Sequence, residues 1–178
     1  MFKSPRAQII MNIILIGFMG SGKSAVGHLL AEELKMNFLD TDELIENIEG
    51  RKISDIFKAD GEEYFRDLET EVIKTLQDYD NFVLSTGGGM VLREENVSLL
   101  KAMGPLVLLW ADPDTVHERV KNETHRPLLD VADPRAEIAK ILELRTPIYE
   151  RTADLKVDTS KMDPAQAAQE IVKWLRSM

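Results

Sequence analysis

Short apolar runs alternate along the chain with segments of helical periodicity. In the helical segments, apolar side chains recur every three or four residues, as they do on one face of a helix. Strands that alternate with helices typically form a parallel sheet with helices packed on both of its faces. The pattern predicts strands at residues 12–16, 37–39, 82–85, 106–110 and 154–157.

Three Asp-Pro pairs mark the starts of predicted helices: Asp112-Pro113, Asp133-Pro134 and Asp163-Pro164. An aspartate side chain caps free backbone N–H groups, and proline suits the first helical position because that N–H has no helical partner. In residues 163–177 the apolar positions form one stripe. We expect this helix to pack on the sheet.

The first predicted strand runs directly into a glycine-rich segment at residues 17–24, with the pattern G-x-x-x-x-G-K-S. Its glycines allow positive φ angles, so successive N–H groups and the positive end of the next helix can converge on phosphate oxygens. Lys23 supplies a mobile ammonium for the outer phosphates, and the hard Ser24 hydroxyl can ligate Mg²⁺. We expect a phosphate-binding loop here; a glycine-rich turn without a ligand is the alternative.

Two stretches interrupt the alternation of strands and helices. Residues 42–80 hold two or three helical segments between the second and third predicted strands, enough to build a second binding surface. Residues 122–133 are polar, contain Pro127 and are followed directly by Pro134, which is typical of a mobile lid and also of an ordinary surface loop. We expect a single domain over residues 1–178, with residues 1–10 as an N-terminal extension.

Composition narrows the classes of function. The formal net charge is −9, with 31 acidic against 22 basic residues, which argues against a nucleic-acid or anionic-membrane surface. Basic contacts to an anionic ligand must therefore be local. The chain has no cysteine, which excludes disulfides and thiol catalysis and, without a transmembrane or targeting segment, favours a cytoplasmic protein.

Polar clusters follow three of the predicted strands at their carboxyl ends, where ligands bind in an open parallel sheet. They are residues 17–24, Asp40-Thr41-Asp42 and Thr86-Gly87-Gly88-Gly89. In extended backbone the two aspartates would share one side of the chain, so one could serve the water shell of a metal while the other reaches an acceptor hydroxyl. The alternative is that Asp42 only caps the helix that follows.

The triple glycine at residues 87–89 offers backbone N–H groups with no side chains in the way. This suits a substrate that lies against the main chain, although a plain strand-to-helix turn is the alternative.

Four arginines are candidates to offset phosphate and carboxylate charge, because a guanidinium binds such anions through two hydrogen bonds. They are Arg66, Arg119, Arg126 and Arg145. A single surface arginine is usually a solvated ion pair, and composition alone does not select these four. Position supports two of them, because Arg126 lies in the predicted lid and Arg66 in the insertion.

Together these motifs resemble the shikimate kinases, which belong to the nucleoside monophosphate kinase group of P-loop proteins. The resemblance runs from about residue 12 to the end of the chain, and the motifs occur in the same order as in the family. The matching stretches are GFMGSGKS at 17–24, FLDTD at 38–42, GEEYFR at 61–66, TGGG at 86–89, RPLL at 126–129 and RTPIY at 145–149.

The resemblance implies a three-layer α/β/α P-loop NTPase fold with a five-stranded parallel sheet, a helical substrate-binding insertion at about residues 42–80 and a lid at about residues 122–133. It implies the ATP-dependent phosphorylation of the 3-hydroxyl of shikimate, giving shikimate 3-phosphate and ADP, a step in aromatic amino acid biosynthesis. The expected partners are shikimate and ATP, with one Mg²⁺ per subunit, and the expected state is a monomer.

The resemblance also implies roles for single residues. Lys23, Asp42 and Arg126 are the expected catalytic residues, with Ser24 bound directly to Mg²⁺ and Asp40 in its outer shell. Shikimate is expected to contact Asp42, Arg66, Gly88 and Arg145, with the two arginines facing its carboxylate. The residues expected to bind ATP are Gly20, Ser21, Gly22, Lys23, Ser24, Ala25, Arg119 beside adenine and Arg126 from the lid.

Two alternatives to this function remain. Gluconate and nucleoside monophosphate kinases share the phosphate loop, but they are not expected to combine the Asp-x-Asp, Phe-Arg and triple-glycine motifs. A binding protein that has lost catalysis would usually lack Lys23, Ser24, Asp42 or the lid arginine, and this sequence has all four.

Overall fold

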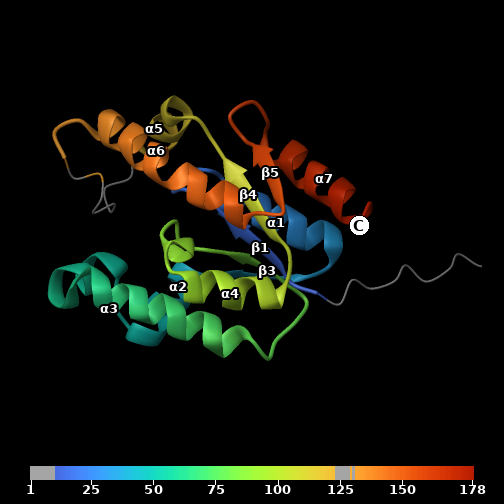
Figure 1. Ribbon diagram of the computed structural model, residues 1–178, viewed down its shortest axis with the longest axis horizontal. Coiled ribbons are helices and arrows are strands. Elements are labelled where there is room, and N and C mark those ends of the chain that lie inside the picture. Colours follow the sequence, from blue (N-terminus) through green and yellow to red (C-terminus); the bar gives the residue numbers. More distant parts are fainter. Residues whose placement is uncertain (1–10, 123–128, 130) are drawn as a thin grey trace, which may run out of the picture.

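A five-stranded, fully parallel sheet lies at the centre of the molecule, in the order β2-β3-β1-β4-β5 (Figure 1). The computed structural model describes residues 11–122, 129 and 131–178. The predicted strands are confirmed, and their ends differ from the predicted ones by at most one residue. They are β1 (Ile13–Ile16), β2 (Asn37–Asp40), β3 (Phe82–Ser85), β4 (Leu106–Trp110) and β5 (Leu155–Asp158).

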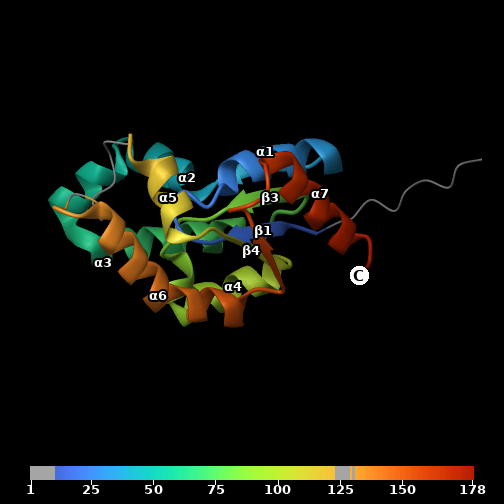
Figure 2. The same cartoon turned by 90° about the horizontal axis from the view of Figure 1, so that it is seen from above.

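Helices cover both faces of the sheet, which confirms the predicted three-layer architecture (Figures 1 and 2). The central strand β1 shows why its sequence is apolar throughout: Ile13 and Leu15 pack into one core cluster, and Ile14 and Ile16 pack into the other. One face carries α1 (Lys23–Leu34) and α7 (Pro164–Leu175), and the other carries α3 (Ile53–Leu76), α4 (Glu94–Met103) and α6 (Pro134–Thr152).

The Asp-Pro pairs start helices as predicted. In each pair the aspartate carboxylate accepts a hydrogen bond from a backbone N–H in the first turn, and the proline occupies the first helical position. The acceptor–donor pairs are Asp112 with Thr115 in α5 (Pro113–Val120), Asp133 with Ala136 in α6, and Asp163 with Gln166 in α7. The apolar stripe of α7 is buried, as expected.

The boundary between β2 and the next helix differs from the prediction. Strand β2 ends at Asp40, and α2 (Thr41–Glu49) begins immediately afterwards. Asp40 is itself the helix cap, because its Oδ1 accepts a hydrogen bond from the backbone N–H of Asp42 at 2.9 Å. The expected placement of both carboxylates on one extended strand is therefore wrong, and so is the alternative in which Asp42 caps the helix.

Between β2 and β3 the chain forms α2 and α3, and α3 is broken at Gly61, where φ is 84° and ψ is 176°. The expectation of two or three helical segments in residues 42–80 is thus confirmed. The predicted lid lies largely outside the described residues, which lack 123–128 and 130, and the expected extension at 1–10 lies outside them entirely. Among the described helices, none has the length and hydrophobicity needed to cross a membrane.

Candidate active site

The glycine-rich loop connects β1 to α1, and its glycines have positive φ angles. At Gly17 φ is 141°, and a Cβ atom would lie 2.2 Å from the carbonyl oxygen of Leu109, so no other residue fits there. At the end of the loop Gly22 has no side chain to cap α1, and the first turn of that helix holds no acidic residue. The first N–H groups of α1 therefore remain suited to an anion.

Lys23 and Ser24 lie at the start of α1 and face two different parts of the site. The Lys23 ammonium lies inside the loop, where it donates hydrogen bonds to the carbonyl oxygens of Gly17 at 2.9 Å and Phe18 at 2.8 Å. The Ser24 hydroxyl donates to Asp40 Oδ2 at 3.2 Å. Two hard oxygen atoms thereby link the start of α1 to the end of β2.

This oxygen pair fits the chemistry of Mg²⁺, which prefers oxygen ligands and commonly binds through one or two protein groups plus phosphates and water. Within the described part of the chain, no group of three or more His, Cys, Asp or Glu side chains is arranged to hold a metal ion. Any Mg²⁺ at Ser24 and Asp40 would therefore depend on a bound phosphate for further oxygens.

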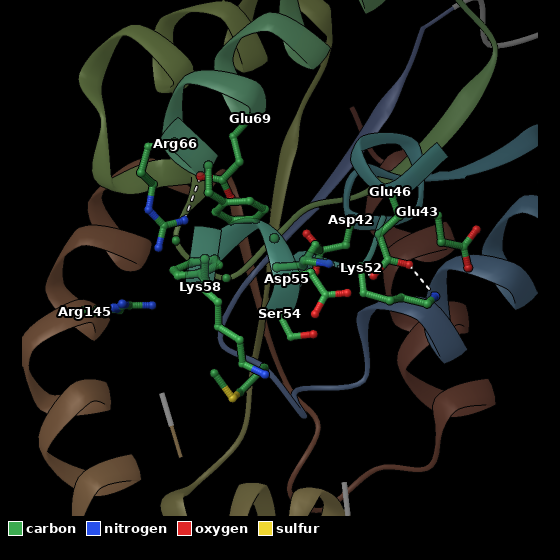
Figure 3. Close-up of a pocket in the computed structure, with 17 residues that line it drawn as sticks. Asp42, Glu43, Glu46, Lys52, Ser54, Asp55, Lys58, Arg66, Glu69 and Arg145 are labelled. Carbon is green, nitrogen blue, oxygen red and sulfur yellow. Dashed lines mark hydrogen bonds and ion pairs between the residues drawn. The ribbon is translucent and has the colours of Figure 1, made fainter. Parts of the chain in front are cut away.

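Two adjoining cavities meet at the carboxyl ends of β1, β2 and β3. The smaller, about 220 Å³, is lined by phosphate-loop residues together with Asp40. The larger, about 660 Å³, is lined by parts of α2, α3 and α6 (Figure 3). Residues common to both cavities are Met19, Asp42, Gly87 and Gly88. Asp42 therefore lies at the junction of the phosphate-loop cavity and the larger one.

Two arginines from different helices line the larger cavity. Arg66 comes from α3 and is buried, with hydrogen bonds from its guanidinium to Glu69 Oε2 at 2.7 Å and Glu62 Oε1 at 2.9 Å. Arg145 comes from α6, and its guanidinium lies 5.9 Å from the centre of the Phe18 ring. Figure 3 shows both guanidinium groups on one side of the cavity, with Asp42 across from them. Such an arrangement suits a small acid whose carboxylate binds the arginines.

Glu69 is fully buried beside Arg66. Burial raises the pKa of its carboxyl from 4.5 to about 7, while the attraction of Arg66 lowers it and the repulsion from Asp42 raises it. Its Oε1 has no hydrogen-bond partner among the residues that the structure describes. The charge on Glu69 therefore changes near neutral pH, close to the predicted acid-binding arginine.

The triple glycine after β3 has a reason that the sequence did not reveal. A Cβ atom at Gly87 would lie 2.9 Å from Asp42 Oδ1, and one at Gly89 would lie 2.4 Å from Arg66 Nη1. The backbone at Gly88 packs on the phosphate loop, because a Cβ atom there would lie 3.4 Å from the backbone nitrogen of Met19. The glycines thus let α2, α3 and the phosphate loop approach one another.

Comparison with known proteins bears on what this arrangement does. A family model described as shikimate kinase matches residues 19–176. The chain belongs to the shikimate kinase family. It is 47% identical over 165 residues to shikimate kinase from Pelotomaculum thermopropionicum, covering 93% of this chain and 95% of that protein. It is 46% identical over 162 residues to shikimate kinase from Thermodesulfovibrio yellowstonii, covering 91% and 93%.

A solved shikimate kinase has the same fold. The structure of the enzyme from Acinetobacter baumannii in complex with shikimate superimposes with a TM-score of 0.92 at 36% identity, covering 96% of this chain and 95% of that one. The predicted family and fold are therefore confirmed. Neither of the two alternatives from the sequence is supported by these similarities.

The structure brings most of the predicted shikimate kinase site together. The expected shikimate contacts Asp42, Arg66, Gly88 and Arg145 all line the larger cavity. Of the expected nucleotide contacts, those that line the smaller cavity are Gly20, Gly22, Lys23, Ser24 and Ala25. Ser21 is buried in the loop and lines neither of these cavities. Arg126 lies outside the described residues.

Arg119 lies beside the phosphate loop but is already engaged by the protein. From α5, its guanidinium donates to the carbonyl oxygens of Gly20 at 3.1 Å and Thr159 at 2.6 Å. The Thr159 hydroxyl in turn donates to the carbonyl oxygen of Ser21 at 2.9 Å. Arg119 therefore links the loop to the end of β5, on the side of the site away from α2 and α3.

Three residues that support the site were given no role from the sequence: Glu69, Tyr149 and Thr159. The first two could have been found from helical spacing. Glu69 follows Arg66 by three residues in α3, and Tyr149 follows Arg145 by four in α6, so both lie one turn from a predicted contact. Thr159 contacts a loop 138 residues earlier in the chain, and nothing in the local sequence signals it.

Proposed function

We propose that this chain transfers the γ-phosphoryl group of ATP to the 3-hydroxyl of shikimate, yielding shikimate 3-phosphate and ADP. Membership of the shikimate kinase family supports this activity. The observation that carries it is the pair of adjoining cavities that share Asp42. Phosphoryl transfer needs a donor and an acceptor held in line more than it needs covalent help from the protein.

On the nucleotide side, we propose that the loop N–H groups, from Gly20 to Ala25, bind the phosphate oxygens and that Lys23 moves to the outer phosphates. The Ser24 hydroxyl would hold Mg²⁺ directly, with Asp40 ordering its water shell. When bound, this ion would neutralise phosphate charge. The hydrogen bond between Ser24 and Asp40 supports this assignment.

On the acceptor side, we propose that Arg66 and Arg145 bind the shikimate carboxylate and that the backbone at Gly88 contacts the ring. Asp42 then accepts a hydrogen bond from the 3-hydroxyl. As the hydroxyl oxygen bonds to the γ-phosphorus and the bond to the ADP oxygen breaks, the proton passes to Asp42. An ordinary aspartate is a weak base for an alcohol, so orientation of the hydroxyl is the larger part of its role.

The remaining assignments rest on the family pattern. We propose that Arg119 lies beside adenine, and that Arg126 reaches the phosphates from a lid whose closure excludes water from the reaction. The bond from Arg119 to Gly20 supports its place on the nucleotide side. The proposed state is a cytoplasmic monomer whose partners are ATP and shikimate.

The proposed activity is tested by measuring ADP release in a coupled assay with Mg²⁺ and ATP, offering shikimate, gluconate or AMP as the acceptor. We expect ADP release with shikimate, and no release above the acceptor-free background with the other two. Equal rates with and without shikimate would refute the assignment.

The proposed role of Asp42 is tested by the Asp42→Asn variant. The amide is similar in size, but it is neutral and carries an NH2 donor, so it orients the hydroxyl poorly and cannot take the proton. We expect kcat to fall by about a hundredfold or more, with little change in the KM for ATP. A variant that instead loses ATP affinity would place this carboxylate on the nucleotide side.

A further inference from the structure

Tyr149 connects two parts of the site that are far apart in the sequence. It lies in α6, one helical turn after Arg145, and its side chain is almost fully buried at 1% exposure. Its hydroxyl donates a hydrogen bond to the carbonyl oxygen of Gly88 at 2.5 Å, across 61 residues of chain. A buried hydroxyl costs free energy unless it is hydrogen-bonded, so this contact fixes the position of the ring.

The Arg145 guanidinium lies near the same hydroxyl. Burial raises the pKa of Tyr149, and the positive charge of Arg145 lowers it less, so the hydroxyl keeps its proton at neutral pH. A tyrosine has one O–H donor, which is used on Gly88, and its oxygen can still accept. Arg145 has only donors, so any hydrogen bond between the two runs from the guanidinium to that oxygen. The hydroxyl therefore bonds to the backbone at Gly88 and lies beside the guanidinium of Arg145.

Gly88 is a sensitive position because it borders both cavities. Its backbone packs against the phosphate loop, where an added Cβ atom would lie 3.4 Å from the nitrogen of Met19 and 3.5 Å from the oxygen of Gly17. A shift of Gly88 would change the spacing between the carboxylate-binding arginine and the phosphate loop. Catalysis by positioning is sensitive to displacements of about 1 Å.

We propose that Tyr149 is a positioning residue whose hydroxyl holds the Arg145 guanidinium and the Gly88 carbonyl in a fixed relation, so that the acceptor acid is bound in register with Asp42. This inference rests on the proposed function, because it concerns the same larger cavity. Tyr149 does not line that cavity, so its effect on the acceptor passes through Arg145 and Gly88.

The test is the Tyr149→Phe variant, which keeps the ring in the core and removes only the hydroxyl. We expect the KM for shikimate to rise about tenfold, as for loss of one hydrogen bond that orients a charged group. The KM for ATP should stay within about twofold. A matched control is Thr152→Val, which removes another buried hydroxyl of α6, one that donates to the carbonyl oxygen of Ile148 at 2.7 Å. Its shikimate KM should equal that of the wild type.

A double-mutant cycle with Arg145→Lys shows whether Tyr149 acts through this arginine. We expect Tyr149→Phe to raise the shikimate KM much less in the Arg145→Lys background than in the wild type. An equal rise in both backgrounds, an unchanged KM in Tyr149→Phe, or a matching rise in Thr152→Val would overturn the inference. If the wild type shows no shikimate-dependent ADP release, the proposed function fails and the inference fails with it. If the wild type is active, the kinetics of the variants test the inference about Tyr149 alone.

Discussion

At the scale of single residues, the phosphate loop could be predicted because its chemistry is local. Each of its glycines, together with Lys23 and Ser24, is recognised within eight consecutive positions. The triple glycine was also predicted to be functional, but the reason why glycine is required there is not local. Gly87 and Gly89 make room for Asp42 and Arg66, side chains that come from helices placed by the fold. Helical spacing places Glu69 one turn from Arg66, but only the packing of α3 shows that it is buried.

The Gly89→Ala substitution tests the close packing of Gly89 on Arg66. Its φ of −97° suits any residue, so Gly89→Ala adds no backbone strain, but its methyl group would lie 2.4 Å from Arg66 Nη1. The end of Arg66 must move away, so we expect the shikimate KM to rise about tenfold or more.

Gly50→Ala is the matched control for Gly89→Ala. Gly50 has a φ of 67° and no atom within 4 Å of an added Cβ, so it should lose about 1 kcal/mol of stability through backbone strain and keep its shikimate KM. Kinetics and thermal melts on both variants check whether only Gly89→Ala raises the shikimate KM. If both variants changed only in stability, close packing on Arg66 would not be what the triple glycine provides.

Glu69 makes stability depend on pH. Burial raises its pKa to about 7 in the folded protein, above the ordinary 4.5, so the folded state binds the extra proton between these values. The stabilisation is complete below about pH 4.5 and is lost as the pH rises towards about 7. Arg66, which faces Glu69, stays charged throughout this range.

Between about pH 4.5 and about pH 8, we expect the free energy of unfolding to fall by about 3 kcal/mol more in the wild type than in the Glu69→Gln variant. Urea unfolding at several pH values measures this difference directly, and titrations common to both proteins cancel. A wild-type curve parallel to that of Glu69→Gln would mean that Glu69 is not protonated in the folded protein near neutral pH.

At the scale of elements, periodicity and capping chemistry predicted most of the secondary structure. The three inner strands β3, β1 and β4 are short apolar runs buried on both faces, and each Asp-Pro pair starts a helix. The sequence did not predict the start of α2 or the break in α3. The chain turns into α2 directly after Asp40, because that aspartate satisfies the free N–H of Asp42. The break in α3 at Gly61 lies in a segment that is otherwise helical, so periodicity could not locate it.

The break at Gly61 should control the shape of the larger cavity. Its φ of 84° and ψ of 176° are accessible almost only to glycine, and the first arm of α3 supplies cavity residues such as Phe57 and Lys58. We expect Gly61→Ala to cost about 2 kcal/mol of stability and to raise the shikimate KM as well. Denaturant unfolding and kinetics on this variant, beside Gly50→Ala, are the check. An unchanged stability would show that α3 straightens without cost.

At the scale of the whole molecule, strand order assembles the site. The sequence predicted that polar clusters meet at the carboxyl ends of parallel strands, but it did not give the order β2-β3-β1-β4-β5. That order makes the ends of β2, β3 and β1 neighbours, with the triple glycine between Asp42 and the phosphate loop. It also explains how a chain of net charge −9 can bind two anions: Lys23, Arg66 and Arg145 are gathered locally, as composition required.

The central claim is that the two adjoining cavities hold the two substrates on either side of Asp42. A crystal structure of the protein with shikimate, Mg²⁺ and a non-hydrolysable ATP analogue tests it most directly. We predict the shikimate carboxylate on Arg66 and Arg145, the terminal phosphate over the loop beside Lys23, and the 3-hydroxyl within hydrogen-bond distance of Asp42. A shikimate carboxylate bound away from both arginines, or a 3-hydroxyl facing away from the terminal phosphate, would contradict the account.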